Sequence, residues 1–123
     1  MTNKIYEGSC HCGQVSFEFH GTPEKLVDCN CSLCSKTGAL WAHSECENIK
    51  VNYADGDTIA YVWGDKSLST HSCSNCGCTT HWEPVQPADF NRMAVNFNLC
   101  SAKDREGLRV RKFDGADTWE FLD

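Results

Sequence analysis

Hydrophobic and polar residues alternate with a period of two along much of the chain. The alternating stretches are residues 15–19, 49–51, 59–63, 93–99 and 108–110, and turn residues such as Gly, Pro and Asp separate them. Successive side chains of a strand point to opposite faces, so this period is typical of half-buried β-strands. Short strands separated by turns at intervals of about ten residues predict an antiparallel, all-β domain.

Helical signals are weak and short. Residues 32–38 could form a single turn that ends at Gly38, and a second short turn is expected to start at Pro87. We therefore predict antiparallel sheets with at most short helical turns.

Length and charge limit what the chain can be. Its 123 residues fit one domain, residues 1–123, and the formal net charge is −6. Lys and Arg cluster only in the short run Arg109, Arg111 and Lys112, which argues against a nucleic-acid partner. No apolar run reaches the roughly 18 residues of a membrane helix. The first residues lack the apolar segment of an export signal, so we expect a cytoplasmic protein that contacts no membrane.

Ten cysteines change this picture. In a reducing compartment cysteines are seldom disulfide partners and are more often metal ligands or reactive thiols. The competing interpretation is a secreted disulfide scaffold, which would require an export signal that the sequence does not show. We expect the cysteines to hold zinc.

The spacing of the cysteines supports metal binding. Three tight groups occupy residues 10–12, 29–34 and 73–78, while Cys46 and Cys100 stand alone. Four thiolates about 2.3 Å from one zinc lie roughly 3.7 Å apart, a distance that C-x-x-C turns and C-x-C strand ends can both provide. One such pair would be a weak signal, but three pairs in one chain are a strong one.

Two zinc sites fit this pattern better than one. Cys10 and Cys12 could join Cys73 and Cys76 in a closed four-thiolate structural site. The remaining group would supply three thiolates, Cys29, Cys31 and Cys34, to a second zinc with one exchangeable position. Three protein ligands plus an open position are typical of catalytic zinc, so these three cysteines are also the candidate catalytic residues.

The alternative is that both zinc ions are structural. Cys78, Cys46, Cys100 or His43 would then close the second site, and Cys78 could also exchange with a ligand of the first. Cys100 follows an alternating run, which favours a buried apolar thiol. The roles of Cys46 and Cys78 stay open.

Other polar residues near the cysteine groups give weaker signals. His11 lies between two proposed ligands and should point away from zinc, while His71 and His81 are expected at exposed strand positions. Lys36 and its neighbours Ser35 and Thr37 follow the second group directly and could hold an anionic substrate, although a solvated turn is the simpler interpretation.

The cysteine groups and their neighbours resemble the glutathione-dependent formaldehyde-activating enzyme (GFA) family, which includes centromere protein V-like proteins. The matching motifs are residues 8–17 (GSCHCGQVSF), Cys29-x-Cys31-Ser32-x-Cys34 with Gly38, Cys73-x-x-Cys76-Gly77, residues 96–100 (NFNLC), and the segment from Phe113-Asp114-Gly115 to Trp119-Glu120. The resemblance therefore covers nearly the whole chain, and the ordered set of three cysteine groups is specific.

The resemblance implies a β-tent fold, a structural zinc held by Cys10, Cys12, Cys73 and Cys76, and a catalytic or labile zinc held by Cys29, Cys31 and Cys34. It also implies a carbon–sulfur lyase whose partners are glutathione, or another small thiol, and formaldehyde or a related aldehyde. A different class remains open, a non-enzymatic zinc module used for protein binding. A methionine sulfoxide reductase-like enzyme with Cys100 as nucleophile ranks last, because the chain lacks the second C-x-x-C of such a site.

Overall fold

Strands dominate the computed structural model, which describes residues 4–122. The strands are β1 (Ile5–Ser9), β2 (Ser16–His20), β3 (Leu26–Cys29), β4 (Trp41–Ser44), β5 (Ile49–Asn52), β6 (Thr58–Val62), β7 (Leu68–Cys73), β8 (Thr79–Pro84), β9 (Met93–Asn96) and β10 (Val110–Phe113). The helical segments are short: α1 (Cys34–Thr37), α2 (Ala102–Arg105) and the 3₁₀ turns η1 (Cys46–Asn48) and η2 (Phe97–Leu99). The predicted all-β class with short helical turns is confirmed.

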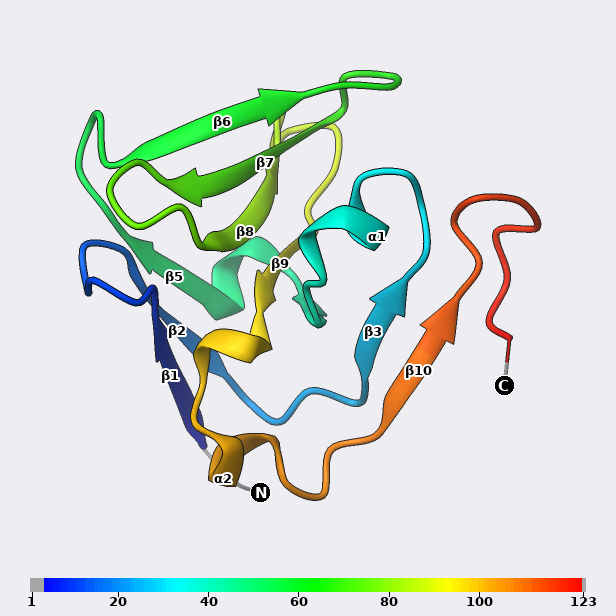
Figure 1. Cartoon of the computed structure of the whole chain (residues 1–123), viewed down its shortest axis with the longest axis horizontal. Coiled ribbons are helices and arrows are strands. Elements are labelled where there is room, and N and C mark those ends of the chain that lie inside the picture. The colour runs from blue at the N-terminus through cyan, green and yellow to red at the C-terminus, as the bar shows by residue number, and fades with distance from the viewer. Residues whose placement is uncertain (1–3, 123) are drawn as a thin grey trace.

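The strands form two sheets (Figure 1). The smaller sheet has the order β1-β2-β5, and the larger has the order β10-β3-β4-β9-β8-β7-β6. Among the strands of residues 4–122, all pairings are antiparallel except one, because β10 runs parallel to β3 from Val110 opposite Leu26 to Phe113 opposite Cys29. The prediction of a wholly antiparallel domain is wrong at this edge, where the chain returns to β3 after a long connection rather than a hairpin turn.

The core lies between the two sheets and is centred on Phe97. This ring is fully buried, and its centroid is 5.4 Å from that of Tyr6 and 5.5 Å from that of Phe19. The inward-facing residues of the alternating run in β2, Phe17 and Phe19, are 2% exposed. The small sheet therefore packs its apolar face onto the large sheet, as the alternation predicts.

One predicted strand is too long. The alternation over residues 93–99 predicts a single strand, but β9 ends at Asn96 and a 3₁₀ turn follows. The Asn96 side-chain oxygen accepts hydrogen bonds from the backbone N–H groups of Leu40 and Asn98, and the second bond caps the turn. A local side-chain bond of this kind competes with strand pairing, and here it redirects the chain.

β6 forms the edge of the large sheet. Ile59 and Tyr61 are 62% and 55% exposed, although residues 59–63 have the alternation of a half-buried strand. Among the described strands β6 pairs only with β7, and the exposure of these side chains shows that little of the described chain covers them. The pattern predicts the strand correctly but does not reveal its exposure.

The predicted helical turn before Gly38 is confirmed as α1. Gly38 adopts the left-handed conformation with φ of 68° and donates its N–H to the carbonyl of Cys34, which ends the helix. Within residues 4–122, no helix has both the length and the apolar character that a membrane crossing requires.

Candidate metal centres

The first cysteine group brings together four thiols from two distant segments. Sulfur atoms of Cys10, Cys12, Cys73 and Cys76 all lie within 4.8 Å of one another. The Cys10–Cys12 and Cys12–Cys73 sulfur separations are 3.7 and 3.6 Å. These values match the roughly 3.7 Å between thiolates around one tetrahedral zinc.

Two turns with glycine hold these thiols in place. The first follows β1 and contains Gly13 with φ of 85°, and the second follows β7 and contains Gly77 with φ of 81°. Both conformations favour glycine. Backbone N–H groups in the turns point at sulfur, as Val15 N does at 3.3 Å from Cys10 and Cys76 N at 3.4 Å from Cys73.

The surroundings of these thiols change their pKa in opposite directions. Backbone N–H groups of Cys78 and Cys12 lower the pKa of Cys76 to about 5, because they stabilise its thiolate. Burial raises the pKa of Cys10 to about 11. A cation bound at this group would favour the thiolate form of both thiols, because metal coordination deprotonates a thiol.

The second cysteine group brings together three thiols at the end of β3 and the start of α1. Sulfur atoms of Cys29, Cys31 and Cys34 lie within 4.8 Å of one another, and each side chain is partly exposed. The backbone N–H of Cys34 donates to Cys31 Sγ at 3.3 Å. The indole Nε1–H of Trp41 donates to Cys34 Sγ at 3.4 Å.

Burial dominates the electrostatics of this second group. It raises the pKa of Cys34, against the opposing effect of the Trp41 N–H, and it also raises the pKa of Cys29. Burial acts in the same direction on Cys31, but hydrogen bonds, led by the backbone N–H of Cys34, outweigh it and lower the pKa of that thiol. Cys31 is thus the member of this group that most readily carries a negative charge.

The C-terminal segment covers one side of the second group. The side-chain amide of Asn30 donates to Asp114 at 3.1 Å and its oxygen accepts from the N–H of Ala116 at 3.0 Å. These bonds hold Gly115 so close that a Cβ atom there would be 2.7 Å from Cys29 Sγ. The segment after β10 therefore forms a wall of this group.

The other candidate ligands lie elsewhere. Among residues 4–122, no further His, Cys, Asp or Glu joins the group of three cysteines within the same distance. Cys100 is 5% exposed in the core, and burial raises its pKa to about 12. Cys78 packs beside the four-thiol group without joining it, and Cys46 packs against the core and donates its backbone N–H to Asn91.

His43 lines a small cavity that contains none of the cysteines. The cavity has a volume of about 140 Å³ and is lined by Glu24, Lys25, His43, Ser44 and Arg92. Burial, together with the positive charges of Arg92 and Lys25, lowers the pKa of His43 to about 4. His43 is therefore a neutral histidine outside both cysteine groups.

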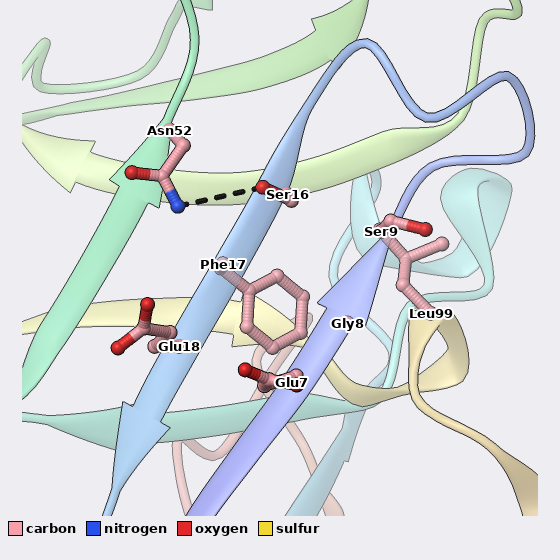
Figure 2. Close-up of a pocket in the computed structure, with 8 residues that line it drawn as sticks. All are labelled: Glu7, Gly8, Ser9, Ser16, Phe17, Glu18, Asn52 and Leu99. Carbon is pink, nitrogen blue, oxygen red and sulfur yellow. Dashed lines mark hydrogen bonds between the residues drawn. The ribbon is translucent and has the colours of Figure 1, made fainter.

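A larger hollow, of about 390 Å³, contains none of the thiols. Figure 2 shows it on β1 and β2, with Glu7, Glu18 and the ring of Phe17 along it. Its lining offers carboxylates and hydroxyls but no cysteine. This hollow is larger than the cavity at His43, but its lining has no thiol that could bind zinc.

The expectation for His71 and His81 is wrong. Both were expected at exposed strand positions, yet they are 6% and 0% exposed. The ring of Tyr53, from the segment after β5, covers them, with centroids 5.7 and 5.5 Å from theirs. Alternation along β7 and β8 predicts which face of the sheet each side chain lies on. It does not predict which other segment covers that face. His11, by contrast, is exposed and outside the thiol group, as expected.

Comparison with known proteins gives a family match and a similar solved structure. A family model described as glutathione-dependent formaldehyde-activating enzyme matches residues 5–110, a span that includes all three cysteine groups. Among solved structures, a structural-genomics crystal structure of a Rhodobacter sphaeroides protein has a TM-score of 0.66 and 24% sequence identity to this chain. The alignment covers 85% of this chain and 98% of that one, and it shows a shared fold.

Proposed function

The chain belongs to the glutathione-dependent formaldehyde-activating enzyme family, and from that membership we propose that it joins a small thiol to an aldehyde at its three-cysteine group. The thiol we propose is glutathione and the aldehyde formaldehyde, with S-hydroxymethylglutathione as product. In the opposite direction the same reaction is that of a carbon–sulfur lyase. We place it in the cytoplasm, because the described cysteines are free thiols.

The proposed reaction is an addition that needs no further reactant. The S–H bond of glutathione breaks, a bond forms between sulfur and the aldehyde carbon, and the π bond of the carbonyl group opens. The proton from the thiol ends on the carbonyl oxygen, which becomes a hydroxyl group. Holding both reactants together gives the protein a large advantage over the reaction in solution, because it removes the entropic cost of their encounter.

The residues present fit zinc at both cysteine groups. Four converging thiols suit a closed structural site, and three converging thiols suit a site that leaves one position to a ligand from outside the chain. Bound at the second group, zinc would supply a positive charge that favours the thiolate form of a thiol and polarises a carbonyl oxygen. We assign Cys10, Cys12, Cys73 and Cys76 to the structural site, and Cys29, Cys31 and Cys34 to the reactive one.

The chain's own residues would position the reactants around the second group. Trp41 holds the Cys34 sulfur through its indole N–H. The turn at Gly115 closes the side next to Cys29. Lys36 is exposed on α1 and offers a positive charge to the carboxylates of glutathione.

One observation carries this proposal: three thiols converge, and no fourth described ligand closes the group. A purely structural site is typically closed by four protein ligands. Cys46, Cys78, Cys100 and His43 were the residues that could have closed it, and none of them does so.

The test is the rate of adduct formation between formaldehyde and glutathione, measured by NMR with the zinc-loaded protein. We expect the wild-type protein to accelerate the reaction. The rate enhancement by Cys34→Ser should be at least about 100-fold smaller, although this variant retains its fold. Cys78→Ser is the matched control, since it removes a thiol outside both groups, and it should keep the activity. Absence of acceleration with glutathione and with several other small thiols would favour the non-enzymatic zinc module instead.

A further inference from the structure

Three side chains on the hairpin of β7 and β8 form a cluster that contains no cysteine. His71 and His81 are direct cross-strand partners, and their rings stack with centroids 4.4 Å apart. Glu83 lies two residues after His81, which places it on the same face of β8. One ligand atom from each of the three lies within 4.8 Å of the others.

The distances in this cluster are near those of a metal site. His71 Nε2 is 3.1 Å from Glu83 Oε1, and His81 Nε2 is 3.8 Å from Glu83 Oε2. Ligand atoms about 2.1 Å from one tetrahedral zinc lie roughly 3.4 Å apart. Small side-chain rotations would therefore bring all three groups to bonding distance of one ion.

The hydrogen bonds of Thr80 determine where the proton of His81 lies. The Thr80 hydroxyl donates to the backbone carbonyl of His71 at 3.3 Å, so its oxygen is an acceptor toward His81 Nδ1, 2.8 Å away. Nδ1 of His81 therefore carries the proton in the neutral ring, and Nε2 carries a lone pair. Burial lowers the pKa of His81 to about 4, which keeps the ring neutral near pH 7.

That lone pair is buried and has no partner. His81 is 0% exposed, and its Nε2 makes no hydrogen bond. The nearest carboxylate oxygen, Glu83 Oε2, is also an acceptor, so two electron-rich atoms face each other at 3.8 Å with no proton between them. Native proteins rarely leave such a group unsatisfied, and a cation between the two atoms would satisfy both.

His71 and Glu83 are also held as ligands commonly are. Thr58 Oγ1 lies 2.9 Å from His71 Nδ1, and Ser69 Oγ lies 3.0 Å from His71 Nε2, so both ring nitrogens have a hydroxyl partner. The Tyr53 hydroxyl donates to Glu83 Oε1 at 3.2 Å. Hydrogen bonds from outside a site typically fix the tautomer of histidine ligands and the orientation of carboxylate ligands.

We propose that His71, His81 and Glu83 form a third metal site, which binds a divalent first-row transition ion such as zinc through two imidazole nitrogens and one carboxylate. This ligand set suits zinc and its neighbours rather than magnesium or calcium, which prefer oxygen ligands alone. The site shares no residue with either cysteine group, so it stands or falls independently of the proposed enzymatic activity.

The test is a count of bound zinc in the full-length protein under reducing conditions. We expect wild type to bind one zinc ion more than Glu83→Gln and His71→Gln, or to bind that ion at least about 100-fold more tightly. His20→Gln is the matched control, because His20 also lies 3.3 Å from a glutamate, Glu18, but on the exposed face of β2 without a second histidine. This variant should keep the full zinc content.

Histidine side-chain NMR gives a second readout, which does not depend on zinc at the cysteines. Zinc should shift the Nε2 resonances of both His71 and His81 in wild type and leave them unchanged in Glu83→Gln. Because Glu83 is partly exposed, this variant should fold even if His71→Gln does not. Equal zinc contents together with equal zinc affinities in wild type and Glu83→Gln, or His81 Nε2 resonances that do not respond to zinc, would overturn the proposal and leave a hydrogen-bonded or water-filled cluster.

Discussion

Individual cysteines in this protein differ mainly through what surrounds their sulfur atoms. Backbone N–H groups lower the pKa of Cys76 to about 5, whereas burial raises that of Cys100 to about 12. A nucleophilic thiol must ionise near neutral pH, which Cys100 in the core does not do. This argues against the methionine sulfoxide reductase-like interpretation, in which Cys100 would be the nucleophile.

His43 should make the protein sensitive to acid. Its pKa is lowered from the ordinary 6.5 to about 4, so the folded protein binds a proton on this ring less readily than the unfolded chain does. The free energy of unfolding should therefore be highest above pH 6.5 and should fall between pH 6.5 and 4, by on the order of 2 kcal/mol from this group. Urea denaturation across this range should show a smaller fall for His43→Gln than for wild type.

Direct titration of the His43 ring by NMR checks the cause of that fall. Lys25 and Arg92 disfavour its charged form, and Glu24 is the acidic residue that lines the same cavity. A measured pKa near 6.5, or equal acid sensitivity of wild type and variant, would show that burial does not hold this ring neutral.

Among the elements, the segment after β10 is the one that approaches the three-cysteine group most closely at Cys29. Phe113 at the end of β10 packs edge-on against Trp119 with centroids 5.1 Å apart, and Asn30 bonds both sides of the turn at Gly115. The close approach of this backbone to Cys29 leaves no room for a side chain. The segment thus acts as a wall whose position depends on a glycine.

Gly115→Ala should weaken metal binding at the three-cysteine group. The new methyl group would lie 2.7 Å from Cys29 Sγ, and relieving such an overlap typically costs about 1–3 kcal/mol. We expect an approximately tenfold or greater loss of zinc affinity at this group, measured by competition with a chromophoric chelator. Ala116→Ser, a change at the exposed neighbouring residue, should have little effect, and equal affinity in both variants would contradict this role of the wall.

The sequence predicts some elements well and others poorly for physical reasons. β2 and β5 are half-buried, so alternation identifies them, and Gly38 marks the end of α1. Alternation also identifies β9 but not its end at Asn96, and β3, which is buried at its first two positions, shows no alternation. The burial of His71 and His81 depends on Tyr53, which is distant in sequence and has no local signal.

At the scale of the whole molecule, the four-thiol group ties the end of β1 to the hairpin of β7 and β8. The two cysteine groups lie on different elements, the first after β1 and β7 and the second at the end of β3 and the start of α1. The spacing of the cysteines predicts the two groups. It does not determine whether Cys76 or Cys78 joins the four-thiol group, because both follow Cys73 at a spacing that a metal site could use. Only the folded chain, which excludes Cys78 from the four-thiol group, separates them.

Removing metal from the four-thiol group should destabilise the whole fold. A metal bound there links residues about 60 positions apart, and its binding energy adds to folding energy. We expect Cys76→Ser to lower Tm by roughly 10 °C or more relative to zinc-loaded wild type, and Cys34→Ser to lower it by much less. Calorimetry with and without a strong chelator measures both effects, and equal losses in the two variants would mean that both groups are structural.

The most direct test of the account is whether the three-cysteine group accepts a thiol from solution. In protein loaded with cobalt in place of zinc, glutathione should increase the thiolate-to-metal charge-transfer absorption by about one thiolate, while S-methylglutathione should not. Cys34→Ser should abolish this increase, and Cys78→Ser should retain it. A spectrum that glutathione leaves unchanged with both cysteine groups loaded would contradict the proposed open position, and with it the assignment of this group as the reactive site.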